Sequence, residues 1–237
     1  FDPGVIPGSG NFVMIRKNKS LGQWYGYKID GVYASQHEIN EQGLTEVLGQ
    51  KIASIRPGDY RFRDQNGDGK ITSADLVLLG SGEPDFTGGL TNTVSYKNLS
   101  LSVAMQFSYG ATVFNANLHS LTSGRDGHNQ IAEMNADGNV FFAGNNEAKY
   151  RMPGGVALNY CTSKMLEDGS FLRIGDITLA YALGKKVAKK VGMQNIKLFA
   201  SVKNLCVFTK YTGFDPEVNT RQGQTGDLMP SLDYSAY

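Results

Sequence analysis

Apolar and polar residues alternate strictly over residues 99–108, the clearest pattern in the chain. The apolar members are Leu99, Leu101, Val103, Met105 and Phe107, and the residues between them are Ser100, Ser102, Ala104, Gln106 and Ser108. A period of two predicts a β-strand with one apolar face. Residues 86–96 form a second expected strand, and the two-residue connection Lys97-Asn98 has the length of a hairpin turn. The sequence therefore predicts an antiparallel hairpin here.

Two more strands are predicted farther along the chain. In the third, Ile177, Leu179, Tyr181 and Leu183 alternate with Asp176, Thr178, Ala180 and Ala182, and Gly184 ends it. The fourth, residues 195–208, carries Ile196, Leu198, Ala200, Val202 and Cys206 on one face and Lys197, Ser201 and Lys203 on the other. Shorter strands are expected near residues 11–16 and 24–33. The fold class predicted is all-β with antiparallel strands.

Short turns and long loops alternate between these strands. The connections are short at 97–98, long at 110–169, shorter again at 184–194 and long from Thr209 onward. Periplasmic turns and extracellular loops of a transmembrane β-barrel alternate in this way, and its strands are about ten residues long. Aromatic residues near the strand ends are predicted to form its interfacial girdles: Phe107, Tyr109, Phe171, Phe208 and Tyr211. A soluble sandwich stays open as an alternative, because alternation does not distinguish a lipid-facing side from a core-facing side.

Residues 64–75 read DQNGDGKITSAD, which matches the spacing of a calcium-binding loop. The predicted ligands are Asp64, Asn66, Asp68, Lys70 through its carbonyl, Thr72 and Asp75, with Gly69 at the sharp turn and Ile71 anchoring the loop. Asp75 stands where Glu is usual, so we expect modest affinity. The alternative is a metal-free loop of Asx-turns. Neither flank reads as a helix, which argues against a sensor.

Composition and charge exclude several function classes. The chain has 29 Gly, 12 Tyr, 12 Phe and a net charge of +1. The sequence lacks a stripe of basic residues interleaved with aromatic residues, so we do not expect it to bind nucleic acid. No nucleophile elbow, phosphate loop or metalloprotease motif is present, so we expect no enzyme. The 2 cysteines are expected to be free thiols. The lysine run in residues 185–190 is interpreted as a solvated periplasmic turn, with contact to anionic groups as the alternative.

Six segments in order resemble the C-terminal part of SusC/RagA-type TonB-dependent outer-membrane transporters. They are residues 21–32, 57–59 running into 64–75, 84–90, 167–174, 202–205 and 211–218. The resemblance implies a barrel of about twenty-two strands, an N-terminal plug, a SusD-like surface lipoprotein as a lid, and energy from the TonB complex. Oligosaccharides or peptides are the implied cargo, and the implied location is the outer membrane of a Gram-negative bacterium.

Residues 1–237 are accordingly expected to be the C-terminal part of the barrel, embedded in a lipid bilayer. The plug, the TonB box and the last strand are expected to be missing, so the fragment needs the remainder of the barrel. Residues 57–80 are predicted as an extracellular calcium-loop-like segment and 110–169 as a long extracellular loop. In that loop no residue is assigned to cargo, although polar candidates occur: Asp126, His128, Asn129, Gln130, Asn145, Asn146 and Tyr150.

The leading hypothesis is therefore part of an outer-membrane nutrient importer. The alternative is a secreted or cell-surface β domain, stabilised by calcium, that binds glycan or a partner protein. The strand faces discriminate between them. In a barrel the apolar face that carries Leu101, Val103 and Leu198 meets lipid, whereas in a sandwich it is covered by a second sheet.

Overall fold

The computed structural model describes residues 22–122, 131–135, 148–151, 161–217 and 232–233. It divides into two compact units. The sheet unit comprises residues 84–111 and 168–211. The loop unit comprises residues 1–83, 112–167 and 212–237. Strands are numerous and helices are short, so the predicted all-β class is confirmed.

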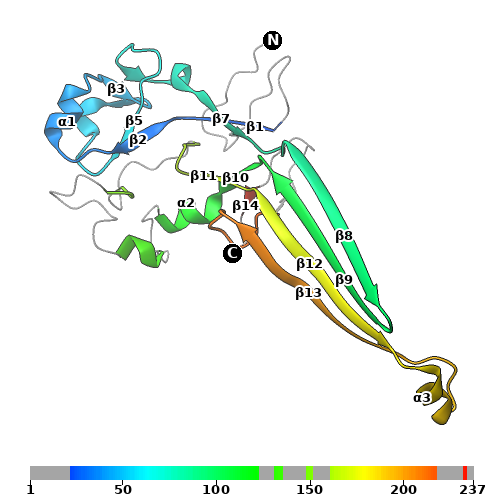
Figure 1. Cartoon of the computed structure of the whole chain (residues 1–237). Coiled ribbons are helices and arrows are strands. Elements are labelled where there is room, and N and C mark those ends of the chain that lie inside the picture. The colour runs from blue at the N-terminus through cyan, green and yellow to red at the C-terminus, as the bar shows by residue number, and fades with distance from the viewer. Residues whose placement is uncertain (1–21, 123–130, 136–147, 152–160, 218–231, 234–237) are drawn as a thin grey trace. The chain divides into compact units, whose positions relative to one another are not determined.

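The sheet unit is built on one four-stranded antiparallel sheet in the order β13-β12-β9-β8 (Figure 1). Its strands are β8 (Phe86–Tyr96), β9 (Leu99–Tyr109), β12 (Phe171–Ala182) and β13 (Lys197–Thr209). The predicted hairpin is confirmed, with Tyr96 paired to Leu99 across the turn. Lys97 has a φ of 54°, the positive value that primed hairpin turns require at their first central residue.

Strand β12 starts at Phe171. The sequence pattern predicted only the part from Asp176 onward, because a β-bulge interrupts the alternation. Ile174 pairs with Met105 and Asp176 with Ala104, so Gly175 is an extra residue opposite β9. On the other side of β12, the compensating irregularity in β13 includes Asn204, which has a φ of 50°. Asn is among the few residues that adopt this left-handed conformation readily. The bulge therefore keeps the apolar residues on both sides of Gly175 on the same face of the sheet.

A short helix, α3 (Lys185–Lys190), connects β12 to β13. The backbone N–H of Ala182 donates to the carbonyl of Asn98 at 2.8 Å, and that of Leu183 donates to Ile196 at 2.9 Å. The first bond holds the base of the α3 connection against the β8–β9 turn, and the second joins the two ends of that connection. Both turns therefore lie at the same end of the sheet (Figure 1).

The loop unit consists of short elements around a compact core. From residue 22 to 83 they are β1 (Gln23–Gly26), β2 (Ile29–Val32), α1 (Gln36–Glu41), β3 (Glu46–Val47), β4 (Gln50–Lys51), η1 (Ile52–Ser54), β5 (Tyr60–Phe62), β6 (Lys70–Ile71), η2 (Ser73–Asp75) and β7 (Val77–Ser81). Strands β1 and β7 pair, as do β2 and β5, and β3 lies between β4 and β6. The strand expected near 24–33 is thus two strands. The strand expected near 11–16 lies outside the described residues.

The segment predicted as one long loop, 110–169, contains regular structure. Its described elements are β10 (Thr112–Asn115), α2 (Ala116–Thr122), η3 (Ala132–Asn135) and β11 (Leu166–Asp168), and β10 lies between β11 and β14 (Leu232–Asp233). The polarity of the sequence did not reveal these elements, because each is too short to show a periodic pattern.

The core of the loop unit brings residues distant in sequence together. Trp24, 1% exposed, stacks on Phe114 at 5.7 Å between ring centroids and donates from its indole N–H to the Thr112 carbonyl at 2.9 Å. Beside it the backbone of β1 approaches Cys161 so closely that a Cβ on Gly26 would lie 2.5 Å from the Cys161 carbonyl oxygen. Burial raises the pKa of the Cys161 thiol to about 12, so this cysteine stays protonated.

Among the described residues, no helix combines the length and the apolar character that a membrane crossing requires.

Ile71 tests how far the calcium-like loop depends on this core. Its side chain is fully buried, at 0% exposure. Ile71→Ala should lower the free energy of unfolding of the loop unit by about 2–5 kcal/mol, because a cavity replaces the buried side chain. Urea unfolding followed by Trp24 fluorescence measures the change. Leu78→Ala, at a side chain that is 51% exposed, is the control and should cost less than about 1 kcal/mol. Equal losses in the two variants would contradict this role of Ile71.

Gly175 tests the bulge. Deleting it leaves Ile174 and Ile177 two positions apart, so regular alternation keeps both on the apolar face and β12 should pair with β9 without the bulge. The variant should keep its folded form, measured as the folded, heat-modifiable band in cold SDS electrophoresis. Deleting Thr178 instead makes Ile177 and Leu179 adjacent, so that they take opposite faces, and this variant should lose the band. Loss of the band in the Gly175 deletion, or its full retention in the Thr178 deletion, would contradict this account of the bulge.

Candidate functional site

One face of the four-stranded sheet is almost entirely apolar. Pairing places the following side chains on it: Phe86, Leu90, Val94, Tyr96, Leu99, Leu101, Val103, Met105, Phe107, Tyr109, Leu172, Ile174, Ile177, Leu179, Tyr181, Leu198, Ala200, Val202, Cys206 and Phe208. We call this the apolar face. The bulge at Gly175 is what keeps Leu172 and Ile174 on the same face as Ile177 and Leu179. The spacing of three between Ile174 and Ile177, across a glycine, was the sequence signal for it.

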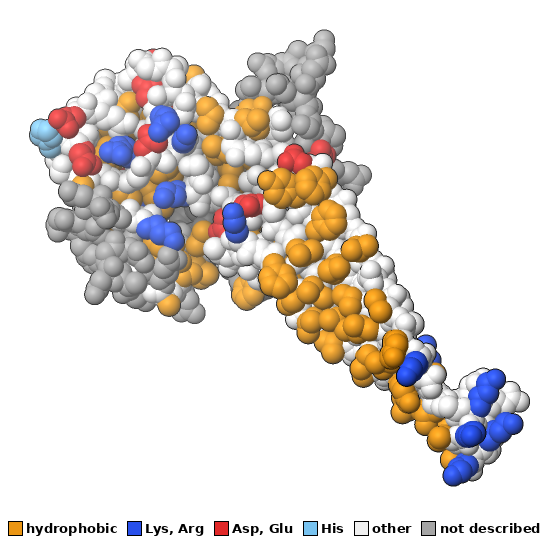
Figure 2. All heavy atoms as spheres, in the orientation of Figure 1, with side chains coloured by type: hydrophobic (Ala, Val, Ile, Leu, Met, Phe, Trp, Pro, Cys, Tyr) orange, Lys and Arg blue, Asp and Glu red, His pale blue; other side chains and the backbone are white. Residues whose placement is uncertain are grey.

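These apolar side chains are exposed. Val94 is 63% exposed, Tyr96 69% and Leu198 59%, and Figure 2 shows hydrophobic side chains gathered along the sheet. Soluble proteins rarely expose an apolar patch of this extent. Covering a large aliphatic side chain is worth roughly 1.5–3 kcal/mol each, so the face as a whole strongly favours an apolar surrounding. Within the described structure no second sheet covers it, contrary to the sandwich alternative.

Aromatic side chains mark both ends of the apolar face. At one end Phe86 and Tyr109 stack with centroids 5.1 Å apart, and at the turn end Tyr96 and Tyr181 are exposed. Leu99 and Tyr109 are separated by ten residue steps, or about 34 Å along a strand. At a tilt of about 40° this corresponds to a height of roughly 26 Å, close to the apolar band of an outer-membrane barrel.

Two of the predicted girdle residues do not belong to this face. Phe171 pairs with Ser108 and Thr209, which places it on the opposite side of the sheet, and Tyr211 is buried beyond the end of β13. Proximity to a strand end was the basis of both predictions, but parity along the strand decides the face. The other predicted girdle residues lie on the apolar face: Phe107, Tyr109 and Phe208.

The opposite face of the sheet is mostly polar, although Phe171, Phe199 and Val207 also lie on it. Its side chains include Thr87, Thr91, Thr93, Ser95, Ser100, Ser102, Gln106, Ser108, Arg173, Asp176, Thr178, Lys197, Ser201 and Lys203. The Thr93 and Ser102 hydroxyls are 3.0 Å apart across two strands. Arg173 lies over the ring of Phe171, 5.7 Å from its centroid. A sheet with one apolar and one polar face can separate a lipid phase from water.

In the calcium-like loop, the described carboxylates bond the loop's own backbone. Asp64 accepts from the N–H groups of Gly67 at 2.7 Å and Gly69 at 2.8 Å. Gly69 has a φ of 77°, as its predicted place at the turn requires. The N–H groups of Gly69 and then Gly67 hold the pKa of Asp64 below its ordinary value, so this side chain stays ionised.

Asp75 closes the loop. It is 0% exposed, and its two oxygens accept from the N–H of Gln65 and the N–H of Thr72, each at 2.8 Å. Thr72 in turn accepts from Ala74 at 3.3 Å, which makes a reciprocal cap of η2. The shorter Asp side chain in place of Glu thus ties the start of the loop to its end.

The remaining predicted ligands lie at the loop surface. Asn66 and Asp68 are exposed, the Asn66 amide donates to Asp68 at 2.9 Å, and Asp68 accepts from the N–H of Lys70 at 2.8 Å. The described part of the chain brings no three His, Cys, Asp or Glu side chains together as a metal-binding group. Each carboxylate oxygen that accepts one N–H still has a lone pair for a cation. The arrangement is that of a tight Asx-turn loop, with oxygens available at its surface.

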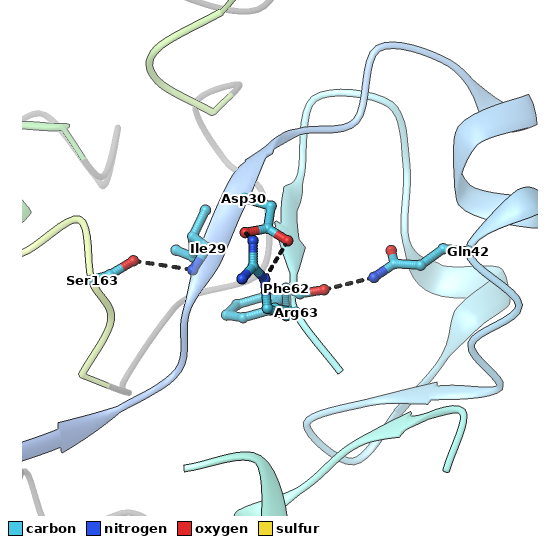
Figure 3. Close-up of polar contacts among 6 residues, drawn as sticks. All are labelled: Ile29, Asp30, Gln42, Phe62, Arg63 and Ser163. Carbon is cyan, nitrogen blue, oxygen red and sulfur yellow. Dashed lines mark hydrogen bonds and ion pairs between the residues drawn. The ribbon is translucent and has the colours of Figure 1, made fainter. Parts of the chain in front are cut away.

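Polar contacts from three segments fix the stem of this loop (Figure 3). Arg63, directly before Asp64, forms a bidentate ion pair with Asp30, at 2.8 Å from Nε and 2.7 Å from a terminal nitrogen. The Gln42 amide donates to the Phe62 carbonyl at 2.6 Å. The N–H of Ile29, on the strand paired with β5, donates to the Ser163 hydroxyl at 3.0 Å. Strand β5, which leads into the loop, is therefore bonded both to β2 and to the Gln42 side chain.

Most polar candidates for cargo binding in residues 110–169 lie outside the described residues: Asp126, His128, Asn129, Gln130, Asn145 and Asn146. Tyr150 is described and is buried, at 6% exposure. It packs with Met134 and Ile131 in a small apolar cluster. A side chain so placed has little surface to offer a bound sugar ring.

The known proteins that are similar to this chain in sequence include several TonB-dependent receptors. TonB-dependent receptor P3 of Formosa agariphila is 33% identical over 226 residues, which cover 94% of this chain and 21% of the receptor. TonB-dependent receptor SusC of Bacteroides thetaiotaomicron is 27% identical over 211 residues, 82% of this chain and 18% of that protein. No protein-family model matches the chain.

Among solved structures, the RagAB peptide importer in its open-open state superposes with a TM-score of 0.65 at 18% identity, over 97% of this chain and 22% of that one. The RagAB peptide transporter gives 0.66 at 19% identity. The fold is thus that of part of a large transporter barrel, which this chain does not close. The chain spans about a fifth of the length of the curated relatives it matches. As its six segments predicted, it is homologous over most of its length to the SusC/RagA-type TonB-dependent receptors.

Proposed function

We propose that this chain forms part of the wall of an outer-membrane β-barrel that imports nutrients with energy from TonB. The observation that carries the proposal is the apolar face, exposed, about as tall as the apolar band of a bilayer, and bounded by aromatic side chains. The face toward lipid comprises residues such as Leu101 and Val202, and the polar face lines the lumen.

The remainder of the barrel is the first partner that the proposal requires. Within the described structure, β8 and β13 each have a neighbouring strand on one side only. An open strand edge carries unpaired N–H and C=O groups, which are costly in a membrane. Further strands of the barrel would pair with both edges.

The other partners follow from the relatives. A SusD-like surface lipoprotein would close the mouth of the barrel, and an oligosaccharide or a peptide would be the cargo. The matches to SusC and to the RagAB peptide importer support this assignment. The location would be the outer membrane of a Gram-negative bacterium, and the activity would be transport rather than catalysis.

We further propose that the loop of residues 64–75 binds calcium and stiffens an extracellular segment. The ligands would be Asp64, Asn66, Asp68, the Lys70 carbonyl and, through remaining lone pairs, Thr72 and Asp75. Support comes from their spacing, from the ionised Asp64 and from the closed geometry that Asp75 already provides. Ten residues separate the loop from strand β8, which runs to the short Lys97-Asn98 turn. With that turn on the periplasmic side, the loop would lie on the extracellular side. Calcium is plentiful there, so weak binding suffices.

Adjacent residues whose side chains lie on opposite faces of the sheet allow a test of the proposed barrel wall. In a Cys206→Ser background, spin labels at Leu101→Cys and Val202→Cys should collide mainly with oxygen, which dissolves in lipid. Labels at the adjacent positions Ser102→Cys and Ser201→Cys should collide mainly with a water-soluble nickel chelate. The measurement is power-saturation electron paramagnetic resonance on the complete transporter in liposomes. The same collision pattern at adjacent positions would refute the two-faced wall.

Limited proteolysis tests the calcium loop. Millimolar calcium should slow cleavage within residues 57–80 several-fold, and a chelator should reverse the effect, because the bound ion bridges the two halves of the loop. Asp68→Asn should remove the protection. Lys70→Gln should keep it, since its proposed ligand is the backbone carbonyl. Cleavage at one rate with and without calcium would leave the Asx-turn interpretation alone.

A further inference from the structure

Five exposed lysines gather at the turn end of the sheet. They are Lys97, Lys185, Lys186, Lys189 and Lys190, which we call the lysine patch. Residues 96–98 and 182–198 contain no Asp or Glu, so these charges have no carboxylate from their own turns to neutralise them. The bond from the Ala182 N–H to the Asn98 carbonyl holds the two turns together. The patch is therefore one surface rather than two separate runs.

Apolar side chains are interleaved with these lysines. Val187 is 50% exposed, Val191 60% and Met193 55%. Ala188 is the buried residue of α3, and its carbonyl accepts from the N–H of Met193 at 3.0 Å. The α3 connection thus packs around Ala188 and exposes both its lysines and its three apolar side chains. A turn that is merely solvated would gain nothing from three exposed apolar side chains.

The lysine patch begins where the apolar face ends. Tyr96 directly precedes Lys97, and Lys185 follows Tyr181 by four residues. Figure 2 shows the basic side chains at this end of the hydrophobic surface. In a membrane-spanning sheet, the level just beyond the aromatic residues is that of the lipid phosphates. Lysine stems lie along apolar surface while their ammonium groups reach such phosphates.

We propose that the lysine patch binds the headgroups of anionic phospholipids in the membrane leaflet at the turn end of the sheet. The lysines contact lipid phosphates, and Val187, Val191 and Met193 lie against the acyl boundary. This inference rests on the proposed function, because it requires the sheet to span a bilayer. An acidic soluble protein would satisfy the charge, but it would not explain why the patch is continuous with the lipid-facing surface. Interfacial segments that bind anionic membranes combine basic and apolar groups in this way.

Lipid-selective quenching tests the proposal on the complete transporter in nanodiscs. A bimane fluorophore at Gln194→Cys, in a Cys206→Ser background, reports on lipid beside α3. Brominated phosphatidylglycerol should quench it with a preference of roughly fivefold over brominated phosphatidylcholine, since each lysine near the surface attracts anionic lipid. Inorganic phosphate at constant ionic strength should not reduce the preference, because free phosphate lacks the acyl chains. A preference abolished by phosphate would assign the patch to a soluble anion and overturn the proposal.

Matched variants test whether the lysine patch causes the preference for anionic lipid. Changing Lys185, Lys186, Lys189 and Lys190 to Gln should reduce it to near unity, and changing the same four to Arg should retain it. The control changes four exposed cations of the loop unit, Lys28, Lys51, Arg56 and Lys164, to Gln and should leave it intact.

The outcomes separate this inference from the proposed function. Quenching by both lipids to the same extent in the parent protein would overturn the lipid preference while leaving the barrel in place. No quenching by either lipid, together with no oxygen contact at Leu101, would instead refute the membrane-spanning sheet. Loss of preference in the control variant as well as in the Gln variant would also count against the patch, because overall charge would then explain it.

Discussion

The antiparallel register of β8, β9, β12 and β13 is the constraint on which the rest of the sheet unit depends. Every cross-strand pair must bring like faces together, because a slip of one residue turns a whole strand over. The bulge at Gly175 reconciles this rule with an apolar spacing that changes inside β12. Asn204 absorbs the matching irregularity in β13. Backbone geometry at two positions thus gives one continuous apolar surface.

The loop unit is stabilised in a different way. Its short strands could not hold together by hydrogen bonds alone, since the longest has only five residues among those before residue 84. Trp24, Phe114 and Ile71 instead supply a shared core, and Asp75 satisfies backbone groups inside it. A buried carboxylate is tolerated there because both oxygens accept N–H groups. Hydrogen bonds within the chain therefore close the loop on itself.

The two units have surfaces suited to different surroundings. The sheet exposes aliphatic side chains and ends in aromatic and then basic residues, an order that follows the layers of a bilayer from acyl chains to phosphates. The loop unit buries its aliphatic side chains in an ordinary core and exposes polar groups, as a water-facing segment does. In a transporter wall this contrast corresponds to a membrane-spanning part and a loop part of one continuous chain.

Alternation determined β9, β13, the second part of β12 and the apolar face of β9, because side chains of a strand point to opposite sides regardless of context. The two-residue length of the Lys97-Asn98 connection determined the hairpin. The family resemblance was likewise carried by local sequence, and so was the turn geometry at Gly69. Three things were decided only by tertiary structure: the place of Phe171 on the polar face, the regular elements within 110–169, and the use of Asp75 as a buried clamp. The first two depend on partners distant in sequence, namely the neighbouring strands and the β10 ladder, and no local pattern contains that information. The third depends on how the loop folds back so that the N–H groups of Gln65 and Thr72 meet one side chain.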